Sequence, residues 1–211
     1  MKKRNSLVYV VLSLALVLAM SMVFVGCDND KVEPEKPENE YANMWEGDDL
    51  TDGAALWTKL KTEAKKNNFR FYDSRKSVDS PSDYYMLQEC NAKAYHVYFI
   101  ENGVKGNEMY CTSDNKTYMA DESGKFTVTD SEEEFDVSAV SKSLDNYLFQ
   151  FDDAEWKYDT ESKKLQAILG MTAFDVTLSN TGMTLSSEHD GFNHEIAVKM
   201  IGHVNIVLPK V

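Results

Sequence analysis

The sequence predicts an α+β fold in which two main helices pack against a large curved antiparallel sheet, an incomplete β-barrel. Three observations lead to this prediction. After residue 48 the chain reads as a helix followed by a run of strands, and this order then occurs a second time. Short turn sequences separate the strands, and such connections join antiparallel neighbours. The strands carry apolar residues on both faces, as expected where both faces of a sheet are covered.

The first predicted helix covers residues 51–68. Leu56 and Leu60 are four residues apart, which places them on the same side of a helix. Asp49 or Thr51 is suited to cap its start, because a side-chain oxygen there accepts a backbone N–H of the first turn. The apolar stripe is narrow, so we expect this helix to lie on a sheet.

Six strands are predicted after the first helix, because this region is rich in aromatic and β-branched residues. Asn102-Gly103 and Ser113-Asp114-Asn115 are typical of the tight turns between strands. The predicted strands are residues 69–72, 84–90, 94–100, 108–112, 117–120 and 125–129.

A second helix is predicted from about residue 136 to residue 150. Its apolar positions follow helical spacing, and we expect them to line whatever space the sheet encloses: Val137, Val140, Leu144 and Leu148. Six more strands follow, and Pro209 ends the last of them. These strands are residues 154–158, 164–169, 172–178, 183–187, 195–200 and 203–208.

The N-terminal stretch has the layout of a secretory signal. Lys2, Lys3 and Arg4 form a positive cap, and Leu7 to Val25 contains no charged residue. A small residue, Gly26, then precedes a cysteine. This order of charged, apolar and small-residue segments is typical of a cleavable export signal.

The end of this stretch, Phe24-Val25-Gly26-Cys27, resembles the lipobox of bacterial lipoproteins, although that family usually has an aliphatic residue in place of Phe24. The resemblance implies that residues 1–26 are a signal peptide. It also implies that Cys27 becomes the mature N-terminus and carries acyl chains such as palmitate. The alternative is an uncleaved membrane helix, because the 19 residues from Leu7 to Val25 are just long enough to span. Both interpretations hold the remaining chain at the extracytoplasmic side of a membrane.

Residues 27–47 are expected to form the lipidated cysteine and a disordered acidic tether, with one domain at 48–211. Asp28 to Asp49 contains nine acidic and two basic residues. A segment so charged and so poor in apolar groups cannot bury enough surface to offset its ordering entropy. Loss of the three basic residues of the signal would change the net charge from −13 to −16. Such acidity argues against nucleic acid as a partner.

The order of elements after the tether resembles the LolA-like fold of bacterial lipoprotein carriers and the related LppX/LprG-type lipoproteins. The resemblance covers about residues 48–211 and includes the closing segment from Val204 to Pro209. In those families a curved, incomplete barrel wraps helices around an apolar cavity for acyl chains. The resemblance therefore implies a lipid or other amphiphile as ligand.

Few residues suggest catalysis or a metal site. Ser113 and Lys116 fit the S-x-x-K spacing of penicillin-binding proteins, but they fall in a predicted turn and not at the start of a buried helix. His189, Asp190, His194 and Glu195 are of metal-ligand type without a known ligand spacing. We predict no cofactor and no metal.

Two cysteines besides Cys27, Cys90 and Cys111, are expected two strands apart in a simple meander. That separation is too wide for a disulfide. An aromatic excess in the first block of strands fits either a filled core or a ligand cavity. These aromatic residues are Tyr84, Tyr85, Tyr95, Tyr98, Phe99, Tyr110, Tyr118 and Phe126.

The leading functional hypothesis is a membrane-tethered, non-catalytic lipoprotein of the cell envelope that holds a lipid or amphiphile in its half-barrel. The alternative is a protein-interaction or sensor lipoprotein with a solid core and an unknown protein partner. An enzyme is a third possibility and depends on convergence of the histidines and carboxylates at 189–195. A continuous apolar cavity would favour the first hypothesis and a filled core the second.

Overall fold

The computed structural model describes residues 36–66, 68–79, 82–131, 136, 140, 144, 146–189 and 191–211. The chain divides into two units, Met1–Glu33 and Pro34–Val211. The first unit lies outside the described residues, and with it Cys27. The second unit is an α+β domain built on one 12-stranded antiparallel sheet that does not close into a barrel, which confirms the predicted fold class.

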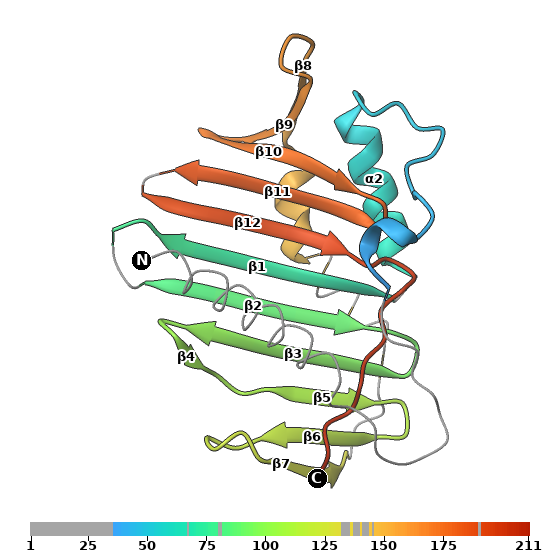
Figure 1. The fold of residues 1–211 in the computed structure, drawn as a ribbon, viewed down its shortest axis with the longest axis vertical. Coiled ribbons are helices and arrows are strands. Elements are labelled where there is room, and N and C mark those ends of the chain that lie inside the picture. Colours follow the sequence, from blue (N-terminus) through green and yellow to red (C-terminus); the bar gives the residue numbers. More distant parts are fainter. Residues whose placement is uncertain are drawn as a thin grey trace, which may run out of the picture. The chain divides into compact units, whose positions relative to one another are not determined.

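The sheet consists of two meanders joined at their centre (Figure 1). The spatial order is β7-β6-β5-β3-β2-β1-β12-β11-β10-β9-β8, and β4 pairs with β3. The first meander comprises β1 (Phe69–Ser77), β2 (Asp83–Cys90), β3 (Ala94–Glu101), β4 (Val104–Lys105), β5 (Met109–Thr112), β6 (Lys116–Ala120) and β7 (Phe126–Asp130). The second comprises β8 (Glu155–Asp159), β9 (Lys164–Leu169), β10 (Thr172–Ser179), β11 (Gly182–His189) and β12 (Phe192–Lys199).

The first and last strands of the domain form the central pair of the sheet. β1 pairs with β12 along its length, from Arg70 opposite Lys199 to Ser77 opposite Phe192. β1 therefore extends five residues beyond its predicted end, through a polar stretch whose backbone is hydrogen-bonded on both sides. Because each meander runs outward from this pair, β7 and β8 are left at the two ends of the sheet order.

The predicted closing strand at residues 203–208 is wrong. β12 ends at Lys199, and Met200 then takes a left-handed conformation with φ 53°. A turn over residues 201–203 carries the chain out of the sheet, and no regular structure follows (Figure 1). β12 already pairs with β1 and β11, so the segment after it has no free strand beside it. The sequence analysis also missed β4.

The hydrophobic core lies on one face of the sheet, beneath α2 (Gly53–Ala64). As predicted, α2 turns Leu56, Leu60 and Ala64 inward, and each is almost completely buried. Asp52 caps the helix by accepting a hydrogen bond from the Ala55 N–H at 3.0 Å. The helix contacts β8 and β9, and its first residue, Gly53, leaves no room for a side chain against Trp156.

The second helical segment packs into the same core at the β8–β12 end of the sheet (Figure 1). Residues 140, 144 and 146–148 are helical, and the 3-10 helix η2 (Phe149–Phe151) follows. Val140, Leu144, Leu148 and Phe151 are all buried in the core. Val137 lies outside the described residues.

Residues 36–47 pack against the domain, whereas the sequence assigned them to the disordered tether. The short 3-10 helix η1 (Glu38–Glu40) begins this segment. Trp45 is 3% exposed, and its indole N–H donates to the Ser179 carbonyl at 2.8 Å. Asn180 donates to the Tyr41 carbonyl at 2.9 Å. The composition of this segment suggests disorder, because it contains no information about partners elsewhere in the chain. Those partners are supplied by the β10–β11 turn.

Candidate functional site

The face of the sheet opposite the core carries a continuous row of rings. Alternation along each strand places these side chains together, because residues two apart point to the same face. Consecutive rings contact each other, with centroids 5.8 Å apart for Tyr85 and Tyr98 and 4.0 Å apart for the stacked His96 and Tyr110. The aromatic row consists of Tyr72, Tyr85, Tyr98, His96, Tyr110 and Phe126.

Most of these rings are half-buried, so one edge of each tyrosine is held by its neighbours while the other meets solvent. Two ammonium groups lie over the row: Lys105 is 5.3 Å from the Tyr98 centroid and Lys199 is 5.8 Å from that of Tyr72. Such contacts between cations and aromatic faces are favourable. Burial, together with the neighbouring Tyr98 hydroxyl, raises the pKa of Tyr85 to about 12, so its hydroxyl is neutral at physiological pH.

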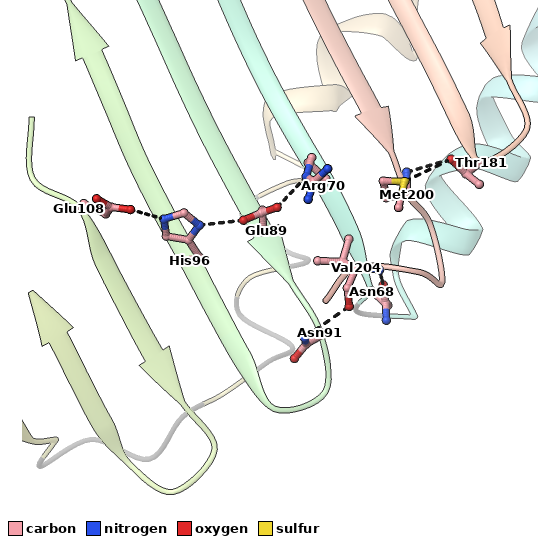
Figure 2. A network of polar contacts seen from close by, with 9 residues as sticks. All are labelled: Asn68, Arg70, Glu89, Asn91, His96, Glu108, Thr181, Met200 and Val204. Carbon is pink, nitrogen blue, oxygen red and sulfur yellow. Dashed lines mark hydrogen bonds and ion pairs between the residues drawn. The ribbon is translucent and has the colours of Figure 1, made fainter. Parts of the chain in front are cut away.

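A chain of hydrogen-bonded polar side chains crosses the same face of the sheet, from Arg70 through Glu89 and His96 to Glu108 (Figure 2). Arg70 Nε donates to Glu89 at 2.6 Å, and the other Glu89 oxygen lies 2.8 Å from His96 Nδ1. His96 Nε2 lies 3.0 Å from Glu108, which also accepts a hydrogen bond from Lys105. Glu89, His96 and Glu108 are buried. We call Arg70, Glu89, His96, Glu108 and Lys105 the polar chain.

The geometry of the polar chain favours ionised carboxylates. Burial alone would raise the pKa of Glu89, but hydrogen bonds from His96 and Arg70 outweigh it and lower that pKa. Burial likewise opposes ionisation of Glu108, yet hydrogen bonds from Lys105 and His96 lower its pKa. His96 bridges the two carboxylates through its two ring nitrogens. The polar chain thus fixes the His96 ring and, through stacking, the Tyr110 ring.

The sequence analysis assigned these residues no joint role. His96, Glu89 and Glu108 all lie in or beside predicted strands, and no sequence motif singles them out. Glu89 lies opposite His96 across β2 and β3, and His96 lies opposite Tyr110 across β3 and β5. Alternation along each strand could have placed Glu89, His96 and Tyr110 on one face of the sheet. The register between the strands, which the sequence does not show, places them side by side.

The aromatic residues that the sequence concentrates in the first block of strands lie on both faces of the sheet. Tyr85, Tyr98, Tyr110, Tyr118 and Phe126 lie on the face of the aromatic row. Tyr84, Tyr95 and Phe99 lie on the core side, where Tyr84 and Tyr95 pack against the core.

The residues considered for a metal site do not converge. His194 lies on the core side and its Nε2 is 3.0 Å from Asp73, whereas the adjacent Glu195 accepts from the Tyr72 hydroxyl on the opposite face. Asp190 lies outside the described residues. Among the residues that are described, no group of three or more histidine, cysteine, aspartate or glutamate side chains could hold a metal ion.

The side chains predicted to line a cavity are core residues where the structure describes them. Val140, Leu144 and Leu148 do not line any of three hollows found on the described part of the chain. One of these, of about 440 Å³, is lined by polar residues that include Lys76, Asp175 and Glu195.

Cys90 and Cys111 are free thiols on the core side of the sheet, with Tyr95 of β3 between them. This is the separation expected of a simple meander. Burial raises the pKa of Cys90 to about 12, so the thiol stays protonated. Ser113 and Lys116 flank the β5–β6 turn, as predicted, with Asn115 in a left-handed conformation at φ 59°.

Comparison with known proteins adds little. No protein-family model matches the chain, and no characterised protein matches its sequence. Among solved structures, "Crystal structure of MucB in complex with MucA(peri)" aligns with 69% of this chain and 92% of that chain, at 10% identity. Its TM-score is 0.12, which does not indicate a common fold. In the part of the chain that the structure describes, no helix is long and apolar enough to cross a membrane.

Proposed function

We propose that this chain is a membrane-tethered lipoprotein of the cell envelope that binds a protein partner through the aromatic row, without catalysis. The observation that carries the proposal is the row itself: half-exposed tyrosines held in place by a buried polar chain. Tyrosine and arginine are enriched at protein interfaces, and rigid aromatic side chains contribute much of the binding energy there.

The filled core supports a protein partner over a lipid cargo. The helix-side face of β1 and β9–β12 is covered by residues that are almost completely buried, among them Leu60, Phe71, Phe151 and Leu185. An acyl chain needs a continuous apolar space. Of three hollows found on the described residues, two are lined largely by polar and charged side chains, and the third mixes charged residues such as Asp73 and Arg75 with Phe71 and Tyr147.

An amphiphile as ligand is a second candidate, supported by the helix-side face of β2 to β6. Phe99 and Met119 are 39% and 44% exposed there. On the same face the side-chain oxygen of Gln88 is buried and has no hydrogen-bond partner among the described residues. A buried acceptor left unpaired is costly, and a hydroxyl on a ligand would satisfy it.

Site-specific photocrosslinking in cells tests the proposed binding face. A photoreactive residue in place of Tyr98 should give one defined protein adduct, because Tyr98 lies within the aromatic row. The matched control is the same residue in place of Met171, which is 93% exposed at the turn between β9 and β10. Loss of the adduct on adding Tyr85→Ala would confirm that the row binds the partner. Lipid adducts alone would contradict it and favour the second candidate.

The anchor has a separate test. Replacing Cys27 with Ser should leave the protein exported but without fatty acid, because no hydroxyl substitutes for the thiol in thioether formation. Metabolic labelling with radioactive palmitate measures the outcome. A labelled Cys27→Ser protein would contradict the lipobox interpretation. A wild-type protein that is neither cleaved nor labelled would instead support the membrane-spanning alternative.

A further inference from the structure

The packing of residues 36–47 limits how far the domain can lie from its proposed anchor. Lys36 is the ninth residue after Cys27. A chain extends by at most about 3.6 Å per residue, so Lys36 lies within roughly 30 Å of the lipidated residue. The strand ends beside Lys36 therefore stay within reach of the bilayer. This step rests on the proposed function, namely on lipidation of Cys27.

The C-terminal segment begins at those same strand ends. The Lys36 N–H donates to the Tyr41 hydroxyl at 3.0 Å, and the Tyr41 ring stacks on His203 at 4.0 Å. Asn68 accepts a hydrogen bond from the Val204 N–H at 2.7 Å, and Asn91 donates to the Val204 carbonyl (Figure 2). The chain that comes from the anchor and the chain that leaves β12 thus meet at one point.

Beyond Val204 the segment exposes apolar side chains. Val204 itself is 5% exposed, whereas Val207, Leu208 and Val211 are 61%, 39% and 67% exposed. Lys210 lies among them in a chain whose net charge is −13. Apolar groups next to a basic residue suit the boundary between acyl chains and phosphate headgroups. Single exposed apolar residues need no explanation, but three within five consecutive residues do.

We infer that residues 204–211, the C-terminal strap, contact the bilayer surface when Cys27 is lipidated. Val207, Leu208 and Val211 would enter the headgroup region, and Lys210 would reach lipid phosphates. The opposite ends of the strands, with the β1–β2 and β11–β12 turns, then point away from the membrane (Figure 1). The aromatic row is thereby left accessible to a partner protein.

Depth-dependent fluorescence quenching tests the C-terminal strap. The lipidated protein carries Cys111→Ser and an engineered cysteine labelled with the fluorophore NBD, at Val207→Cys or, as the control, Val104→Cys. Val104 is 70% exposed in β4, which pairs with the far end of β3. In phosphatidylcholine–phosphatidylglycerol vesicles, lipids with a shallow nitroxide should quench the label at 207 several times more than the label at 104.

The outcomes separate the two proposals. If the labelled protein fails to float with the vesicles, the lipid anchor is wrong and the inference falls with it. Flotation with equal or no quenching at the two positions overturns the C-terminal strap while the anchor stands. A signal at 207 that depends on protein density and not on the nitroxide lipid indicates contact with a second copy, and also overturns the inference.

Discussion

At the residue scale, the polar chain is the most constrained feature of the domain. Glu89 links Arg70 to His96, and its neighbours leave it almost no contact with water. Removing one member of a buried charged network costs the desolvation of those that remain. The residues of the polar chain therefore contribute to stability whether or not they contact a partner.

Replacing Glu89 with Gln should destabilise the domain by about 1 to 3 kcal/mol at neutral pH. The folded pKa of Glu89 lies below its ordinary value, so its ionised form stabilises the fold above the unfolded pKa. This stabilisation is lost as the pH falls through the lower, folded pKa. The difference between wild type and Glu89→Gln in urea unfolding should therefore shrink in acid. The exposed Glu122→Gln is the control, and an equal loss at every pH would contradict the prediction.

At the element scale, the burial of the helical segment around residues 140–151 bears on whether the domain has a packed core or a ligand cavity. Leu144 is 2% exposed and Leu148 is 1% exposed, and both belong to the core that α2 and the strands share. Phe151, at the end of η2, packs edge-on against Phe174 at 5.2 Å. The described residues of this segment are thus part of the packed core.

Replacing Leu144 with Ala should cost about 2 to 5 kcal/mol, because the loss of burial is combined with a new void. Urea unfolding of wild type and Leu144→Ala, each delipidated and with added phospholipid, measures this. We expect no shift with phospholipid in either protein. A small mutational loss together with lipid-induced stabilisation would instead indicate an open cavity, since a ligand stabilises the state that it binds.

At the scale of the whole molecule, the β1–β12 pair joins two meanders that the chain builds separately. The three tryptophans, Trp45, Trp57 and Trp156, all pack on the side of the second meander or of α2. Their fluorescence therefore reports unfolding of that half of the domain.

A substitution in the first meander should lower the urea midpoint seen by these tryptophans. Val97 lies in β3 between Gln88 and Met109, distant in the sheet from the second meander. Val97→Ala should cost about 1 kcal/mol, because the side chain is only partly buried. If the sheet unfolds as one unit, fluorescence and far-UV circular dichroism should shift together. A shift in circular dichroism alone would show that the meanders unfold independently.

The local elements of the domain could be predicted from neighbouring residues alone. The spacing of Leu56 and Leu60 identified α2, and Asn102-Gly103 and Ser113-Asp114-Asn115 placed two turns, because these signals depend on residues near one another. Eleven of the twelve predicted strands are present, and the antiparallel α+β class follows from their short connections. The lipobox at Cys27 remains a prediction of this local kind.

Which strands and side chains pair with each other depends on contacts between distant parts of the chain. The β1–β12 register extended a polar strand through Arg75 and Lys76, and because β12 already pairs on both sides, residues 203–208 do not continue the sheet. The β10–β11 turn held Trp45 in a segment whose composition suggests disorder. His96 met Glu89 and Glu108 because three strands came into register. Hydrogen bonds and burial between residues distant in the chain decide such features, and local sequence patterns do not encode them.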